Sequence, residues 1–209
     1  MGLLGGTFNP PHLGHLICAQ EALEQLALDV VLLVPAGSPP HKAVEDEPGA
    51  RVRYELCRAA VAGEERIGVS ELEIDREGPS YTVDTLRLLH ERDPGDELTF
   101  IVGADMAQSL ATWREPREVL RLARLAVAER AGVGRREIVE RLAPLEIGGR
   151  VVFFDMPRID VSSSALRSRV AAGRSLRHWV PDAVAHEIAA RGLYRPGGAA
   201  DAAEKGITA

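Results

Sequence analysis

Short apolar runs rich in β-branched residues alternate with amphipathic stretches along most of this chain. A strand buried on both faces of a sheet reads as a continuous apolar run, whereas a covering helix is apolar on one side only. The alternation therefore predicts an α/β fold in which helices cover a parallel sheet. The expected strands are residues 1–4, 30–34, 67–69, 72–74, 98–102, 125–128 and 151–154.

Helices are expected between these strands and at the end of the chain. Apolar residues recur at helical spacing from Leu16 to Leu26, and a second helix is expected from near Pro48. Further helices are predicted over residues 81–91, 164–172 and 181–191. No linker divides the sequence, so we expect one domain over residues 1–195, with a helical C-terminal part at about 162–195. The small, polar tail at 196–209 is expected to be disordered.

Composition narrows the class of protein. A formal charge of −6 in 209 residues argues against a protein that coats nucleic acid, so any anion site must be local. Cys18 and Cys57 lie in apolar helical stretches without a metal-binding pattern, which indicates buried thiols in a reducing compartment. No signal peptide and no membrane-length apolar stretch is visible. We therefore expect a cytoplasmic protein that binds neither nucleic acid nor membrane.

The string GGTFNPPHLGH, residues 5–15, stands between the first predicted strand and the first predicted helix. Glycines at a strand's carboxyl end let the backbone approach a phosphate closely, and a helix beginning just beyond offers N–H groups and a positive dipole end. The string has neither the GxGxxG of dinucleotide-binding proteins nor the GK[ST] of a P-loop. We call residues 5–15 the glycine–histidine loop and predict that it holds a polyphosphate.

Two histidines close this loop. His12 and His15 are three residues apart, which on a helix places both imidazoles on one face, where they could donate to a phosphate oxygen together. A helix-capping pair is the structural alternative for an isolated HxxH. Zinc is not expected, because no third ligand follows at a familiar spacing.

The loop resembles the GGxFxPxHxGH signature of the nucleotidyltransferase superfamily, and residues 162–167, SSSALR, resemble its second, ISSTxIR-like signature. The resemblance implies a Rossmann-like parallel sheet with helices on both faces and a small C-terminal helical part. It also implies that ATP is bound by Gly5, Gly6, Thr7, Phe8, His15, Gly103, Asp105, Ser162, Ser163 and Arg167. Catalytic roles would fall to His15, His12, Lys42 and Arg167.

The middle of the chain indicates which member of the superfamily is closest. Residues 80–86, SYTVDTL, and the pattern GxDxxxxLxxW from Gly103 to Trp113 resemble bacterial nicotinate-nucleotide adenylyltransferases. The resemblance covers residues 1 to 194 and implies that nicotinate mononucleotide receives AMP from ATP, giving deamido-NAD. Its implied contacts are Thr7, His41, Lys42, Tyr81, Thr82, Trp113 and Arg130. Trp113 would stack on the pyridine ring, and the backbone at Tyr81 and Thr82 would bind the carboxylate.

Two positions depart from the family pattern. Asn9 stands where aspartate is more frequent, which removes a negative charge beside the phosphate site. Ala131 follows Arg130 where relatives often carry an Arg-Pro-Gly turn.

Direct in-line displacement is the expected mechanism, and Mg²⁺ is expected to arrive with ATP because no dedicated carboxylate cluster is visible. Pantetheine-phosphate adenylyl transfer and cytidylyl transfer are the nearest alternatives, although the SYTxDTL segment and its tryptophan speak against them. A non-catalytic nucleotide-binding module is a third. The HIGH element of class I aminoacyl-tRNA synthetases also resembles the loop, which we interpret as kinship of fold alone. Oligomeric state and the preference for nicotinate over nicotinamide mononucleotide stay open, as does the role of the tail.

Overall fold

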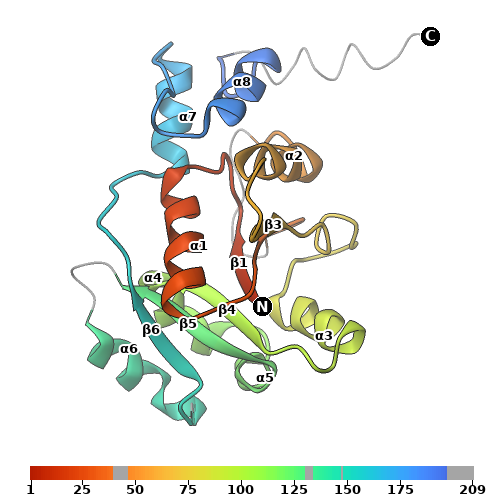
Figure 1. The fold of residues 1–209 in the computed structure, drawn as a ribbon, viewed down its shortest axis with the longest axis vertical. Helices are drawn as coiled ribbons and strands as arrows, with labels where there is room; N and C mark the ends of the chain where they lie inside the picture. Colours follow the sequence, from red (N-terminus) through yellow and green to blue (C-terminus); the bar gives the residue numbers. More distant parts are fainter. Residues whose placement is uncertain (40–46, 130–133, 147, 197–209) are drawn as a thin grey trace.

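A computed structural model describes residues 1–39, 47–129, 134–146 and 148–196 of the chain. Its centre is a sheet of six strands in the order β3-β2-β1-β4-β5-β6, with every neighbouring pair parallel (Figure 1). The strands are β1 (Gly2–Gly6), β2 (Val31–Pro35), β3 (Ile67–Val69), β4 (Leu98–Gly103), β5 (Ala123–Glu129) and β6 (Val151–Asp155). The predicted α/β class with a Rossmann-like parallel sheet is confirmed.

Helices cover both faces of this sheet. They are α1 (Leu13–Gln25), α2 (Ala50–Ala60), α3 (Thr82–Arg92), α4 (Ala104–Ser109), α5 (Pro116–Leu122), α6 (Arg135–Leu142), α7 (Ser163–Ala171) and α8 (Asp182–Ala190), with short 3₁₀ turns η1 (Leu110–Thr112) and η2 (Ala143–Leu145). Successive strand residues point to opposite faces. Leu3 accordingly packs with residues of α3 to α6, and Leu4 with residues of α1 and α2.

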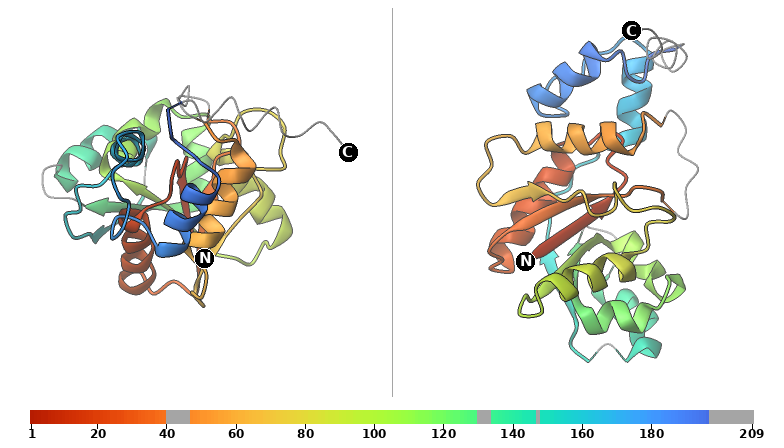
Figure 2. Two further views of the ribbon diagram at one scale, coloured as in Figure 1. Left: turned by 90° about the horizontal axis from the view of Figure 1, so that it is seen from above. Right: turned by 90° about the vertical axis from the view of Figure 1, so that its right-hand side faces the viewer.

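The C-terminal helices form a small unit of their own above α2 (Figure 2). Leu56 of α2 shares a third apolar cluster with Leu166 of α7 and with Val184 and Ile188 of α8. At the edge of this contact Arg191 forms an ion pair with Glu55, 2.5 Å from nitrogen to oxygen. The predicted C-terminal helical part therefore packs against the sheet domain through α2.

The chain reverses its direction of winding between β1 and β4. β1 pairs with β2 on one side and with β4 on the other, although β4 comes much later in the sequence. Ligands of open α/β sheets bind at such a switch point, beyond the carboxyl ends of the strands. The glycine–histidine loop leaves β1 at this place.

The structure differs from the sequence-based prediction in one strand, which is absent, and in three helices, which were not predicted. Residues 72–74 form a turn, in which the N–H of Ile74 donates to the carbonyl of Glu71 at 2.9 Å. The prediction of a strand there was wrong. An apolar–polar–apolar pattern over only three residues is as compatible with a turn as with a strand. Helices α4, α5 and α6 were not predicted; two of them have fewer than eight residues, too short to show a helical repeat.

Candidate functional site

A cavity of about 470 Å³ opens at the switch point, within the range of about 300–1,000 Å³ that small-molecule sites occupy. It lies between the β1–α1 turn and the segments that lead into α3 and out of α4. Its lining is Leu4, Gly5, Gly6, Thr7, Gly14, His15, Cys18, Val34, Ala36, Pro39, Glu73, Ser80, Tyr81, Thr82, Phe100, Val102, Gly103, Met106, Trp113, Arg114, Ala128 and Met156. Segments far apart in the sequence thus build one concave site.

The glycine–histidine loop is held in a tight conformation at one side of this cavity. Phe8 has a left-handed backbone (φ 50°) that costs a non-glycine residue about 1–2 kcal/mol. Its ring is 2% exposed and meets the ring of His15 edge to face, with centroids 4.8 Å apart. A Cβ on Gly14 would lie 3.1 Å from Nδ1 of His12, so a side chain there would press on the first histidine. The buried aromatic ring offsets the backbone strain and fixes the course of the loop.

The two histidines take different positions. His15 belongs to the first turn of α1 and lines the cavity, whereas His12 is the N-cap residue, 5% exposed and outside the lining. Their rings stack with centroids 3.7 Å apart. The two imidazoles therefore lie side by side, but only His15 belongs to the helix, since His12 has an extended backbone before the helix begins.

His15 has a defined tautomer in its neutral form. The backbone N–H of His12 donates to Nδ1 of His15 at 3.1 Å, so the proton of a neutral imidazole sits on Nε2. This bond also caps α1. Capping and donation are therefore compatible, because the cap uses one ring nitrogen and the other carries the proton.

The second signature lies against the first. Ser163 Oγ donates to the carbonyl of Pro10 at 2.8 Å, and Arg167 Nη1 donates to the carbonyl of Asn9 at 3.0 Å. Within the described residues, Nε of Arg167 is buried and has no hydrogen-bond partner. Ser162 serves as the N-cap of α7, where its Oγ accepts from Ala165. The structure thus brings Ser163 and Arg167 to the loop, although neither they nor Ser162 line the cavity.

The side chain of Asn9 has a structural partner. Asn9 is 2% exposed, and its Oδ1 accepts a hydrogen bond of 2.6 Å from the hydroxyl of Tyr194. Burial is the main reason that the pKa of Tyr194 is raised, so this hydroxyl stays protonated and remains a donor. Asn9, which stands where the family more often has aspartate, therefore binds Tyr194 near the end of the described chain.

A buried arginine joins two loops at the cavity. Arg53 of α2 is 1% exposed; it donates to the carbonyl of Thr7 at 2.9 Å and to the carbonyl of Gly37 at 3.1 Å. Its Nε lies 2.6 Å from Oε1 of Glu47, which supplies the opposite charge that a buried cation requires. The loops after β1 and β2 are thereby fixed to one rigid helix.

The opposite side of the cavity is formed by Tyr81, Thr82, Trp113 and Arg114, which we call the aromatic wall. Tyr81 is the N-cap of α3 and Thr82 its first residue, and both line the cavity, so the helix N-terminus lies at this wall. Trp113 follows η1; its ring meets Phe100 edge to face at 6.0 Å, and its Nε1–H donates to Ser109 Oγ at 3.1 Å. These two contacts, with Phe100 and Ser109, fix the orientation of the indole.

Backbone contacts tie the entry of α3 to the loop after β2. The N–H of Ser80 donates to the carbonyl of Ser38 at 2.8 Å, and the N–H of Ser38 donates to Ser80 Oγ at 3.2 Å. A Cβ on Gly37 would lie 2.0 Å from the carbonyl oxygen of Glu73, so only glycine fits this close approach. Glu73 accepts a hydrogen bond of 2.6 Å from the Thr85 hydroxyl of α3.

Several predicted residues lie at the edge of the site or outside the described part of the chain. Gly103 lines the cavity and precedes α4, whereas Asp105 is exposed on the first turn of that helix and is not in the lining. His41, Lys42 and Arg130 fall outside the described residues, as does Ala131. Their roles stay predictions.

Sequence reasoning missed Arg53 and Arg114. The signal for Arg53 was present: it lies three, four and seven residues before Leu56, Cys57 and Ala60, all buried on the inner face of α2. A charged residue on such a face requires buried partners. Arg114 gave no signal beyond its place after Trp113.

Over the described ranges, no group of three or more histidine, cysteine, aspartate or glutamate side chains could hold a metal ion. No helix in the same part of the chain is long and apolar enough to cross a bilayer. Cys18 and Cys57 are both buried, as predicted, and burial raises the pKa of the Cys57 thiol well above its usual range.

Comparisons with known proteins agree with the geometry. A family model described as cytidylyltransferase-like matches residues 3–169. A probable nicotinate-nucleotide adenylyltransferase of Thermus thermophilus is 47% identical over 195 residues, covering 93% of this chain and 99% of the relative. One from Rubrobacter xylanophilus is 39% identical over 196 residues, covering 93% and 92%.

Solved structures share the fold. The nicotinic acid mononucleotide adenylyltransferase of Plasmodium falciparum complexed with NaAD superimposes with a TM-score of 0.76 at 16% identity, covering 92% of this chain and 96% of that one. A putative nicotinate-nucleotide adenylyltransferase from Vibrio parahaemolyticus gives a TM-score of 0.61 at 22% identity, covering 93% and 94%. At these identities the match concerns the fold alone.

Proposed function

Because the chain belongs to the cytidylyltransferase-like family and, within it, to the nicotinate-nucleotide adenylyltransferases, we propose that it transfers AMP from ATP to nicotinate mononucleotide. The products are deamido-NAD and pyrophosphate, and the reaction is a step of NAD biosynthesis. The observation that carries this function is the cavity at the switch point, which joins the glycine–histidine loop to the aromatic wall.

The reaction is a direct in-line displacement. A phosphate oxygen of nicotinate mononucleotide forms a bond to the α-phosphorus of ATP, while the bond from that phosphorus to the bridging oxygen breaks. Pyrophosphate leaves with the electron pair. The attacking oxygen is already ionised near neutral pH, so the protein needs no nucleophile, and catalysis rests on positioning and charge stabilisation.

The groups for these tasks lie on the glycine–histidine loop and beside it. We assign His15 Nε2–H and the N-terminus of α1 to the phosphate oxygens, because both face the cavity and the capping bond places the imidazole proton on Nε2. Arg167, whose Nε is buried without a partner among the described residues, supplies a further donor. Lys42 keeps its predicted role at the phosphates.

The pyridine end of the substrate belongs at the aromatic wall. Trp113 offers a ring for stacking, and the N-terminus of α3 at Tyr81 and Thr82 suits an anionic substituent. Mg²⁺ would arrive with ATP, because Glu73 is the sole carboxylate in the described cavity lining and a single carboxylate suits an ion held mainly by phosphates and water. We propose that the reaction takes place in the cytoplasm, where both substrates are available.

Pyrophosphate release tests this function directly. The chain is incubated with ATP and Mg²⁺ and with nicotinate mononucleotide, nicotinamide mononucleotide or phosphopantetheine. We expect the highest kcat/KM with nicotinate mononucleotide. Release with phosphopantetheine alone would replace the acceptor while keeping the chemistry, and no release with any acceptor would favour a binding module.

A further inference from the structure

Arg114 stands out among the residues that line the cavity. Within the described lining it is the one lysine or arginine, and it directly follows Trp113 in the chain. Its side chain is about half exposed, at 53%. An anionic ligand that enters the cavity therefore meets this guanidinium on the aromatic wall.

A contact with an aromatic ring orients the guanidinium of Arg114 and uses none of its N–H donors. Its Cζ lies over the ring of Tyr81, 4.8 Å from the ring centroid. A cation–π contact of this kind is worth about 0.5–1 kcal/mol at an exposed site and leaves the N–H groups at the rim available. Arg114 is thus held beside the N-terminus of α3, where two sources of positive potential add.

Two carboxylates lie within ion-pair distance of Arg114, but neither accepts a hydrogen bond from it. Its closest approaches are 3.7 Å to Glu115 and 4.0 Å to Asp84. Glu115 instead accepts two hydrogen bonds, of 3.1 and 2.5 Å, from Arg87. The hydrogen bond from Arg87 is the main reason that the pKa of Glu115 lies below its usual value. No hydrogen bond joins Arg114 to any described residue in this structure, so its N–H groups are available to a ligand while the two carboxylates help to orient the guanidinium.

The backbone places Trp113 and Arg114 together at the cavity. Glu115 adopts a left-handed conformation (φ 48°, ψ 56°), and Pro116 then begins α5. Trp113 has an extended backbone, and both Trp113 and Arg114 lie between η1 and α5 and line the cavity. A strained non-glycine residue at a site edge points to a functional constraint.

We infer that Arg114 selects the acceptor: its guanidinium donates charge-assisted hydrogen bonds to the pyridine carboxylate of nicotinate mononucleotide, which nicotinamide mononucleotide lacks. This inference rests on the proposed function. The acceptor's phosphate must reach ATP beside His15, so its ring, stacked on Trp113, presents the carboxylate to the aromatic wall. The carboxylate is therefore the anionic group nearer to Arg114.

The experiment compares kcat/KM for nicotinate and nicotinamide mononucleotide, measured separately at saturating ATP. The variants are Arg114→Gln, which removes the charge, and Arg114→Lys, which keeps it without the planar fork. Arg117→Gln is the matched control, because Arg117 is exposed on α5, is absent from the lining and bonds to the Pro144 carbonyl. Thermal unfolding of each variant verifies that the fold is retained.

We expect Arg114→Gln to lower kcat/KM for nicotinate mononucleotide about tenfold, chiefly through KM, and to leave that for nicotinamide mononucleotide within about twofold. Arg114→Lys should keep part of the preference, and Arg117→Gln all of it. An equal loss for both acceptors would overturn the inference, because the shared phosphate would then be the partner. An unchanged preference would also overturn it while the proposed function stands. Absence of turnover by the wild-type chain with either mononucleotide would remove the proposed function as well.

Discussion

The glycine–histidine loop and the aromatic wall face the same cavity but are built differently. In the loop, Phe8, Asn9 and His12 are at most 5% exposed, and Arg53, Ser163, Arg167 and Tyr194 bond to it from three other elements or segments. On the wall, Arg114 is about half exposed and Tyr81 and Trp113 are half-buried. The difference indicates that the glycine–histidine loop, which we assign to the phosphates, is preorganised. The aromatic wall, which we assign to the pyridine ring of the acceptor, is more accessible to solvent. Mutations in the loop should therefore reduce kcat or stability, and mutations on the wall should change acceptor binding.

The largest effect is expected at His15. His15→Ala removes a donor that faces the phosphates, and loss of one such donor costs about 100- to 1,000-fold in kcat. ATP binding should persist, because the glycines and the helix N-terminus remain. Single-turnover kinetics and calorimetric ATP titration measure the two quantities. His90→Ala, in the last turn of α3, is the control, and turnover near the wild-type rate in His15→Ala would contradict the role of His15.

Substitution of Arg53 tests whether the glycine–histidine loop needs the hydrogen bond from α2 to the carbonyl of Thr7. Arg53→Met leaves Glu47 and two carbonyls without their donor; Glu47 is partly exposed and can be hydrated, so we expect a loss of about 1.5–3 kcal/mol of unfolding free energy, as for hydrogen bonds to a charged group. We expect KM for ATP to rise as well, because Thr7 loses its support. Urea denaturation and steady-state kinetics provide the measurements. Arg53→Lys should fall between wild type and Arg53→Met; a fully stable Arg53→Met would show that the network contributes nothing.

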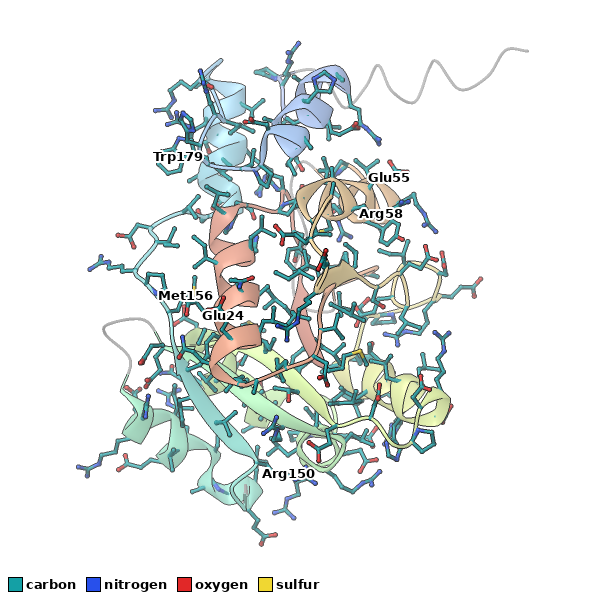
Figure 3. All side chains as sticks on the ribbon, viewed as in Figure 1. Glu24, Glu55, Arg58, Arg150, Met156 and Trp179 are labelled. Carbon is teal, nitrogen blue, oxygen red and sulfur yellow. The ribbon has the colours of Figure 1, made fainter. Side chains whose placement is uncertain are left out.

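Trp113 probes the wall. Trp113→Ala should raise KM for nicotinate mononucleotide about tenfold and leave KM for ATP nearly unchanged, since an aromatic pair contributes about 0.5–1.5 kcal/mol beyond its buried area. Trp113→Phe should recover most of the loss. Figure 3 shows Trp179 beside α7, where it packs under the guanidinium of Arg169, so Trp179→Ala is a matched control. Equal changes in both KM values for Trp113→Ala would indicate a structural tryptophan.

The smallest effect is expected at the end of the described chain. Tyr194→Phe removes the hydrogen bond to Asn9 and should lower the free energy of unfolding by about 1 kcal/mol. The kcat should change less than in His15→Ala, because Tyr194 holds the loop from outside the cavity. Thermal unfolding at fixed pH checks the stability change. A large fall in kcat without a change in stability would place Tyr194 in the reaction itself.

Much of the fold could be predicted because a buried parallel strand gives a signal in a few consecutive residues. The run before Pro35 and the run at residues 98–102 were predicted within about one residue of β2 and β4, because continuous apolar runs specify strands buried on both faces. Helices α4 and α5 escaped prediction, since one or two turns cannot show a 3.6-residue repeat. The turn at residues 72–74 was mistaken for a strand for the same reason of length.

The candidate site was predictable where a motif spans adjacent residues and hidden where it depends on distant ones. The glycine–histidine loop was located correctly because its residues follow one another between a strand and a helix. The difference between His12 and His15 depends on where α1 begins, a boundary that local pattern leaves uncertain. Arg53 binds the carbonyls of Thr7 and Gly37, and Arg114 lies near Asp84; these partners are distant in the sequence and could not be read from neighbouring positions.

The α/β class, the loop at the end of β1 and the family could all be recognised from the amino-acid sequence, because each depends on the order and spacing of nearby residues. Packing in three dimensions brings Ser163 and Arg167 to a loop more than 150 positions earlier, and it places Arg114 at the cavity with two carboxylates at 3.7 and 4.0 Å but no hydrogen bond to either. The physical reason is that hydrogen bonds and charge pairing act over a few ångströms in space. Only the packing of α7 on the loop and of Arg87 on Glu115 brings the relevant atoms within that range.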